Sequence, residues 1–262
     1  MSLLPREHGA YGQLAMPIAT SLVVSDLSLP AVLLSLSVVC GFLAHEPLLV
    51  FLGRRGARAR RDMHKGATIW FVTTAVAAVF LGVSATWLMP DEIRWSIMMP
   101  AMPAGFLGGT IVAGREKSLP GEIAAALAFS FAAYPISLAS NAPRGTAVAI
   151  AAVFAIVSVV GTLAVRGILA SMRHGGRGPG TRPARIWVPL VGATALTILA
   201  AAASRSVVPW VALPAAAPGI VAAVLISNYP LAPLRLPAVG WTLAGASAAA
   251  TLILAIALGG AG

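Results

Sequence analysis

A histidine and a glutamate stand side by side inside an apolar run, in the stretch FLAHEPLLVFLGRR at residues 42–55. His45 and Glu46 exchange protons readily, so they are candidates for general acid–base catalysis. Glu46 lies eight residues before Arg54, or roughly 12 Å along a helix. An ionised carboxylate at that depth in a membrane is unfavourable unless it is paired or hydrated. The alternative is a structural pair, satisfied by Arg115 or a buried water.

A second polar stretch is PREHGAYGQLAMP, at residues 5–17, which is polar as far as Gln13 and then turns apolar. His8 in this stretch is a candidate metal ligand or acid–base group, and Arg6 is a candidate for binding a substrate anion. The alternative is an interfacial anchor, in which Arg6 and Tyr11 lie at the level of the lipid headgroups.

A third stretch, GREKSLPGE at residues 114–122, has the pattern of a helix start. Ser118 is a candidate N-cap, and Glu122 falls in the first turn, where it is also a candidate catalytic group. The exposed N–H groups of such a start, together with Arg115 and Lys117, suit an anion such as a phosphate. The alternative is simple capping within a basic loop.

Two basic loops, RRGARARRDMHKG and RHGGRGPGTRPAR, are also candidates for holding an anionic substrate, through Arg54 and Arg55 in the first loop. The competing explanation is attraction to acidic lipids and membrane topology. Tyr229, in SNYPLAPLR, is a candidate to complete the site, or it is an interfacial tyrosine. The single cysteine, Cys40, excludes a disulfide or a CxxC site, and the sequence identifies neither a metal nor a cofactor.

The composition determines what kind of structure positions these residues. Hydrophobic residues make up 58% of the 262 residues, charged residues make up 10%, and the mean hydropathy is +0.89. Soluble domains carry about a quarter charged residues, so this chain is expected to be an integral membrane protein with one polytopic domain over 1–262. Its opening lacks the pattern of a signal peptide. The net charge of +10 is explained by topology, and no nucleic-acid partner is expected.

Apolar runs near 20 residues predict an all-α protein with nine transmembrane helices. The expected spans are about 10–25, 29–53, 67–89, 95–113, 121–140, 146–172, 186–203, 207–226 and 237–259. This alternation puts fifteen Lys and Arg on one side, and only Arg94, Arg144 and Arg205 on the other. The positive-inside rule then predicts a cytoplasmic amino terminus and a carboxyl terminus on the periplasmic or outer side.

The two basic loops are alike in length and charge, and they are four spans apart. This spacing predicts a 4+4+1 arrangement, in which two halves are related by a parallel internal repeat. Repeats of this kind place a site at the interface between the halves.

The stretches PREHGAYGQLAMP, AHEPLLVFLGRRGARA and REKSLPGEIAAALAFS together resemble the YwiC-like family of bacterial membrane proteins. The resemblance implies a multi-pass protein of the bacterial cytoplasmic (inner) membrane. It transfers no catalytic residues, because the family has no assigned reaction.

The topology is also similar, more weakly, to that of UbiA-type prenyltransferases, whose acidic motifs follow helices 2 and 6. No NDxxDxxxD follows the second span here, and the loop after the sixth span has no acidic residue. Ordinary magnesium-dependent prenyl transfer is therefore not expected. Direct binding of diphosphate by arginines of the basic loops is the corresponding hypothesis.

Three functions fit these observations. The first is a UbiA-like intramembrane enzyme that acts on an isoprenoid or another lipidic, anionic substrate. The second is a transporter or permease for a small solute, suggested by mid-span residues such as Pro100, Pro103 and Gly108. The third is a haem- or metal-binding subunit, or an assembly factor, of a respiratory complex, with His8 and His45 as ligands.

Overall fold

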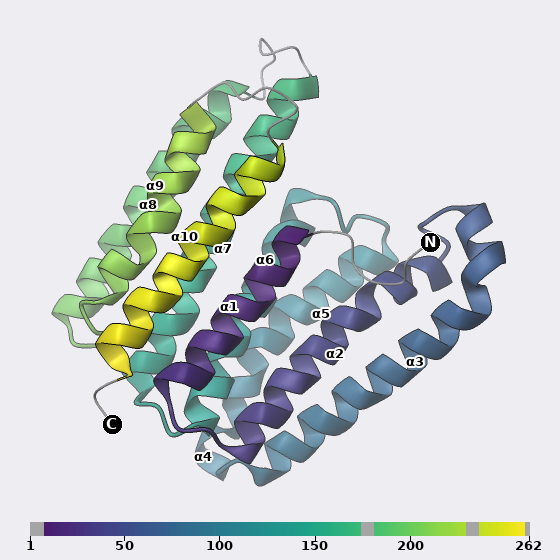
Figure 1. Ribbon diagram of the computed structural model, residues 1–262, viewed down its shortest axis with the longest axis horizontal. Coiled ribbons are helices and arrows are strands. Elements are labelled where there is room, and N and C mark those ends of the chain that lie inside the picture. Colours follow the sequence, from purple (N-terminus) through teal and green to yellow (C-terminus); the bar gives the residue numbers. More distant parts are fainter. Residues whose placement is uncertain (1–7, 174–180, 229–235, 260–262) are drawn as a thin grey trace.

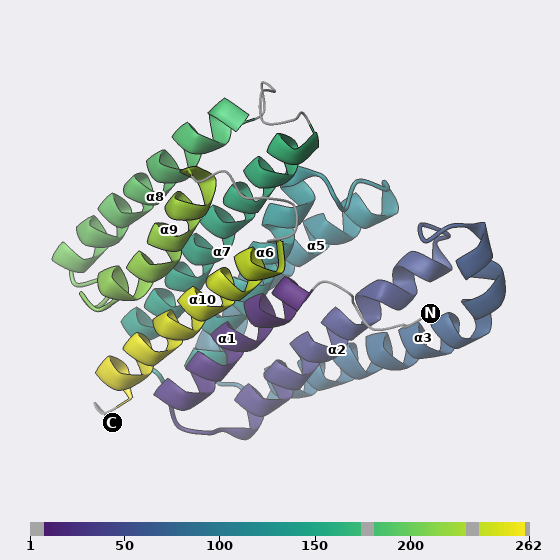
Figure 2. The same ribbon diagram turned by 45° about the horizontal axis from the view of Figure 1, so that its top comes forward.

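The computed structural model describes residues 8–173, 181–228 and 236–259, and every regular element within these ranges is a helix. Successive long helices run up and down the bundle in alternating directions (Figures 1 and 2). The elements are α1 (His8–Val24), α2 (Leu29–Phe51), α3 (Ala57–Leu88), α4 (Asp91–Arg94), the 3-10 turn η1 (Trp95–Ile97), α5 (Met98–Val112), α6 (Leu119–Ala139), α7 (Arg144–Arg173), α8 (Thr181–Ser204), α9 (Ala212–Asn228) and α10 (Leu236–Leu258).

Seven segments of the described ranges are long and apolar enough to cross a membrane, and α4, η1 and α5 together make one of them. The helices α1 and α9 are shorter, with 17 residues each, or about 26 Å at 1.5 Å per residue. The expectation of an all-α integral membrane protein is confirmed, and the observed helices follow the nine expected spans in order.

The third span begins earlier than expected, because α3 starts at Ala57 rather than near residue 67. Most of the expected basic loop is thus helical. Its alanine, arginine and lysine residues favour a helix, and Arg58 lies one turn from Asp62, with Nε 3.8 Å from Oδ2. The connection between α2 and α3 shrinks to residues 52–56.

The proline-rich eighth span differs in the opposite direction, because its helix starts later than expected. Residues 205–211 are irregular, and the helix begins only at Ala212, with Pro214 in its first turn and Pro218 inside. Proline is tolerated in the first turn because the N–H that it lacks has no partner within the helix there.

The helices α1, α6, α7, α9 and α10 form a closed ring of neighbours, with α8 packed on α7 and α9 (Figure 1). On the other flank, α2 and α3 pack as a hairpin, whereas α5 packs against α6. The trio α7, α8 and α9 thus has no equivalent trio among α2, α3 and α5, and the internal repeat stays a prediction.

Small and hydroxyl-bearing residues bring the ring helices close together, as is typical of helices packed in membranes. Thr20 of α1 donates a hydrogen bond to the Met16 carbonyl, and its Oγ1 lies 3.0 Å from Oγ1 of Thr251 on α10. Between α9 and α7, a methyl group added to Gly219 would lie 2.5 Å from Cγ2 of Val157, so only a glycine fits there without rearrangement.

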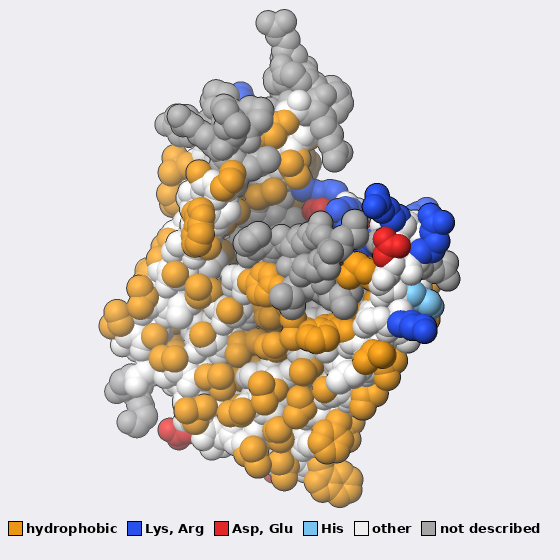
Figure 3. Space-filling model, turned by 45° about the vertical axis from the view of Figure 1, so that its right-hand side comes forward, with side chains coloured by type: hydrophobic (Ala, Val, Ile, Leu, Met, Phe, Trp, Pro, Cys, Tyr) orange, Lys and Arg blue, Asp and Glu red, His pale blue; other side chains and the backbone are white. Residues whose placement is uncertain are grey.

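Basic side chains gather where α2 ends and α3 and α6 begin, which we call the basic end (Figure 3). Below it, the face shown in Figure 3 is largely hydrophobic. The described basic residues of these connections and of the first turns of α3 are Arg54, Arg55, Arg58, Arg61, Lys65, Arg115 and Lys117.

Candidate functional site

A cavity of about 1820 Å³ lies between the helices and reaches the basic end. Most of its wall is apolar and comes from α1, α2, α3, α5, α6, α7, α8 and α10. Its charged, histidine and amide side chains are Gln13, His45, Glu46, Arg55, Glu116, Lys117, Glu122 and Arg166. Ligand pockets usually measure about 300–1,000 Å³, so this one has room for a long-chain molecule.

The turn at the end of α2 brings Arg55 back to Glu46. The N–H of Arg54 donates to the carbonyl of Leu49, and the N–H of Gly53 donates to that of Val50. This pattern is a Schellman motif, and Gly53 has the positive φ of 73° that the motif requires. The chain therefore reverses immediately after α2.

Arg55 folds back from this turn onto Glu46 and binds it through two nitrogens. Nε donates to Oε1 at 2.7 Å, and Nη2 donates to Oε2 at 2.5 Å. Glu46 is only 5% exposed, so this two-pronged pair supplies the neutralisation that a buried carboxylate needs. The structural alternative named Arg115 as the partner, but the partner is Arg55; Arg115 is exposed and lies outside the cavity wall.

The start of α6 has the expected cap. Ser118 is the N-cap, and its Oγ accepts a hydrogen bond from the N–H of Gly121 at 3.3 Å. Glu122 stands in the first turn, where the helix dipole favours a negative charge. The N-cap and the place of Glu122 are therefore confirmed.

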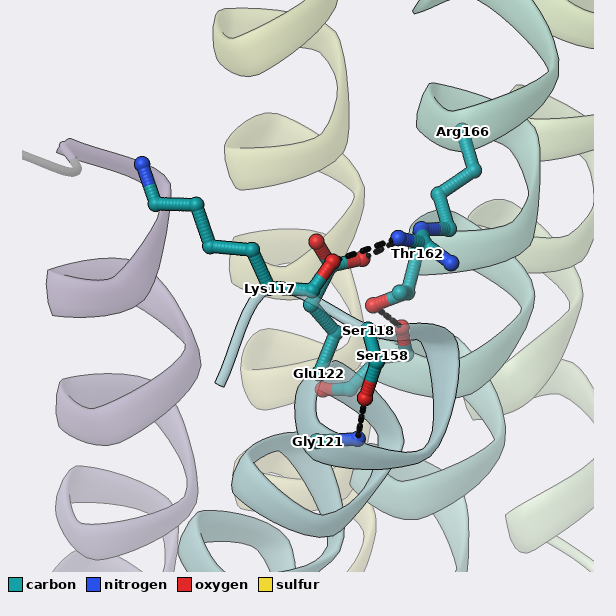
Figure 4. Close-up of polar contacts among 7 residues, drawn as sticks. All are labelled: Lys117, Ser118, Gly121, Glu122, Ser158, Thr162 and Arg166. Atoms are coloured by element: carbon teal, nitrogen blue, oxygen red, sulfur yellow. Dashed lines mark hydrogen bonds and ion pairs between the residues drawn. The ribbon is translucent and has the colours of Figure 1, made fainter. Parts of the chain in front are cut away.

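Glu122 forms a second ion pair with an arginine of another helix (Figure 4). Nε of Arg166, on α7, lies 2.8 Å from Oε2 of Glu122, and Nη2 of the same arginine donates to the carbonyl of Lys117 at 2.7 Å. The side chains of Arg166 and Glu122 are 34% and 37% exposed. Figure 4 shows the Lys117 amine pointing away from this pair.

Replacing Ser118 by alanine is expected to lower the free energy of unfolding by about 1 kcal/mol, because one N–H at the start of α6 loses its acceptor. The thermal unfolding midpoint of the detergent-solubilised protein measures this change. Ser204→Ala is the control, because that exposed serine lies at the end of α8 and bonds only to the carbonyl of Ala201. Equal midpoints for the two variants would contradict the capping role.

Arg54 has a structural position rather than a place in the cavity wall. Its Nη2 donates to the carbonyl of Val112 at 2.6 Å, at the end of α5, where the helix dipole favours a cation. Its guanidinium also lies against Gly114, where an added methyl group would be 2.6 Å from Nη1. Arg54 thus ties the α2–α3 connection to the α5–α6 connection.

Of the other residues that the sequence predicts for the site, some lie outside the described part of the structure and one lines the cavity. Arg6 and Tyr229 lie outside the described residues, and His8 is the first residue of α1, with a side chain outside the described part. His45 lines the cavity beside Glu46. Over the described ranges, no group of three or more His, Cys, Asp or Glu side chains comes together in a way that would hold a metal ion.

Arg166, like Glu116, is a charged residue of the cavity that the sequence analysis did not name as a site candidate. It entered that analysis only as one of the basic residues that set the topology. The signal was present, because Arg166 is a lone charge inside an apolar run, seven residues before Arg173. A charge in that position, like Glu46, needs a partner within the bundle.

A comparison with models of protein families shows to which family the chain belongs. A model of the YwiC-like protein family matches residues 4–137, just over half of the chain. The chain belongs to the YwiC-like family. The YwiC-like match covers α1 to α5 and most of α6, and it therefore includes Glu46, Glu116, Glu122 and Arg55 of the cavity, whereas Arg166 lies beyond it. No curated protein and no solved structure matches the chain.

Proposed function

We propose that this YwiC-like protein is an intramembrane enzyme that acts on a lipidic substrate with an anionic head, such as an isoprenoid diphosphate. The observation that carries the proposal is the pair of carboxylate–arginine contacts, Glu46–Arg55 and Glu122–Arg166, at the polar end of one large apolar cavity. An amphiphile matches such a cavity, because its head needs charged partners and its chain needs hydrocarbon walls.

The arginines are the groups that bind the head. A guanidinium presents its donors in a planar fork that fits the oxygens of a phosphate, and it does so without a metal ion. Each arginine of the cavity is also held by a carboxylate, so Glu46 and Glu122 act as positioning residues. His45, next to Glu46 on the cavity wall, is the candidate for the acid–base group.

An enzyme on a lipid head agrees with the charge distribution better than a transporter does. The ionisable residues of the cavity lie towards the basic end, whereas solute sites of transporters lie near the bilayer midplane. The positive-inside rule supports a cytoplasmic basic end, in the inner membrane of a bacterium. A UbiA-like architecture is part of the proposal, because it would place the head at the same membrane face.

Calorimetric titration of the protein in detergent tests the proposal with farnesyl diphosphate as the probe. We expect farnesyl diphosphate to bind at least about tenfold more tightly than farnesol, which lacks the charged head, or inorganic diphosphate, which lacks the chain. EDTA is not expected to weaken binding. The proposal would be abandoned if the wild-type protein bound no farnesyl diphosphate.

The Arg166→Met variant is expected to weaken farnesyl diphosphate binding about tenfold, by removing one charge-assisted contact to the head. Arg94→Met is the matched control, because Arg94 also pairs with an acidic residue, Asp91, but on the connection between α3 and α5 at the opposite end. Equal losses in the two variants would argue against a head site at the basic end.

A further inference from the structure

The helices α3 and α5 are separated along the chain only by the short elements α4 and η1, yet they pack on different neighbours. The main contact of α3 is with α2, and α5 packs on α6. Both helices nevertheless contribute to the cavity wall, α3 with residues such as Val79 and Gly82, and α5 with residues such as Ala101 and Gly108. We call this part of the cavity, walled by α2, α3, α5 and α6, the lateral groove.

The lateral groove is open towards the surface that faces lipid. Val79 and Val83 of α3 line the cavity, although 66% and 61% of their surfaces are exposed. Ala101 and Ala104, on α5, also line the cavity and are exposed. Because α3 and α5 do not pack closely on each other, these exposed side chains mark a mouth of the cavity between two membrane-spanning segments, at the depth of the bilayer hydrocarbon.

The wall of the lateral groove presents hydrocarbon to an occupant. Its hydroxyl groups are already engaged with backbone, since Ser37 donates to the carbonyl of Ala78 and Thr86 donates to that of Gly82, each at 2.7 Å. The α5 wall runs from Pro100 to Ile111, or about 17 Å at 1.5 Å per residue. That length exceeds half of the bilayer's hydrocarbon thickness of about 30 Å.

The walls contributed by α1 and α7 differ in chemistry. They contain Gln13 and Ser158, whose side chains carry hydrogen-bonding groups. A hydrocarbon chain would desolvate these groups without giving them partners, which is unfavourable. The lateral groove is continuous with the head site at Glu46 and Arg55, because all of these residues belong to one cavity.

From these observations we infer that the lateral groove holds the single hydrocarbon chain of the substrate, which enters sideways from the bilayer between α3 and α5. The inference rests on the proposed function, because it assumes that the head of the same molecule binds at the basic end. It adds the path of the chain, which the head site alone does not define.

The variant Gly108→Phe tests the inference by filling the lateral groove. A Cβ atom at Gly108 meets no atom within 4 Å, so the larger side chain has open space to occupy. We expect farnesyl diphosphate to bind about tenfold more weakly, because the phenyl ring excludes part of the chain. Binding of inorganic diphosphate should be unchanged. Calorimetric titration measures both ligands, and the unfolding midpoint verifies the fold.

Two control variants carry the same substitution elsewhere. Gly109 is the next residue of α5 and also has open space, but it is not part of the cavity wall, so Gly109→Phe should bind farnesyl diphosphate like the wild type. Gly240→Phe fills the α10 wall instead. A loss of binding in Gly240→Phe but not in Gly108→Phe would overturn the inference and leave the proposed function standing.

A competition experiment separates the isoprenoid chain from an ordinary two-chain lipid. Dioleoyl phosphatidylglycerol, added to micelles of the wild-type protein at the same concentration as farnesyl diphosphate, is expected to leave binding unchanged. Displacement by the phospholipid would overturn the inference in favour of a bilayer lipid in the groove. A wild-type protein that binds no farnesyl diphosphate at all would instead refute the proposed function.

Discussion

Replacing Arg55 by methionine is expected to lower the free energy of unfolding by about 3 kcal/mol, one of the two largest effects of any single change that we consider. The variant keeps most of the aliphatic stem but removes both hydrogen bonds to Glu46, a residue that is only 5% exposed. A buried charge without a partner is far less favourable than the pair. Unfolding titration in a denaturing detergent measures the change.

A second substitution distinguishes the lost pair from lost packing. In the double variant Arg55→Met with Glu46→Gln no buried charge remains, so most of the stability should return. Arg58→Met is the control, because Arg58 and Asp62 form an exposed pair that contributes little. A double variant no more stable than Arg55→Met would show that the charge of Glu46 is not what makes the single variant unstable.

Replacing Gly121 by alanine is expected to lower the free energy of unfolding by about 2 kcal/mol, as overpacking of a close contact does. The added methyl group would lie 2.6 Å from the carbonyl oxygen of Glu116, and a backbone atom cannot rotate away as a flexible side chain can. The shift would move the neighbouring Lys117 carbonyl, which accepts the hydrogen bond from Arg166. Weaker binding of farnesyl diphosphate should therefore accompany the lower stability.

Gly109→Ala is the control for the change in helix propensity. Its added methyl group meets no atom within 4 Å, so the variant should be unchanged or up to about 1 kcal/mol more stable, because alanine favours a helix more than glycine does. The two alanine variants are thus expected to differ in the sign of their effect. A Gly121→Ala protein as stable as the wild type would show that the α5–α6 connection is free to move away from α6.

Most of the fold was predictable from the sequence because it depends on local patterns. Apolar runs located most of the helices to within a few residues, whereas the membrane orientation expected from the basic loops stays a prediction. The predicted start of the third span was wrong, because its charged first residues form a helix and not a loop. The helical spacing of Arg58 and Asp62 was the signal for this helix. The neighbours of each helix were not predictable from the sequence. The apolar faces of the helices are similar in composition, so they do not specify which helix packs against which.

The candidate site was predictable in part for the same reason. His45, Glu46 and Glu122 stood out because a charged or titratable group in an apolar run is unfavourable without a partner. The partners themselves follow from the fold. Arg55 reaches Glu46 only because the chain reverses at Gly53, and Arg166 reaches Glu122 only because α7 packs on α6. Neither contact follows from spacing along the chain.

The hydrogen bond between Thr20 of α1 and Thr251 of α10 has a consequence for how the protein is made. The two residues are 231 positions apart, so at about 5–20 residues per second the ribosome needs roughly 10–50 s to deliver the second after the first. During that interval α1 has been synthesised, but the neighbour that later covers its α10 face has not. The bundle therefore stays incomplete until α10 has been made. Until then one face of α1 is uncovered, and insertion factors would protect that face.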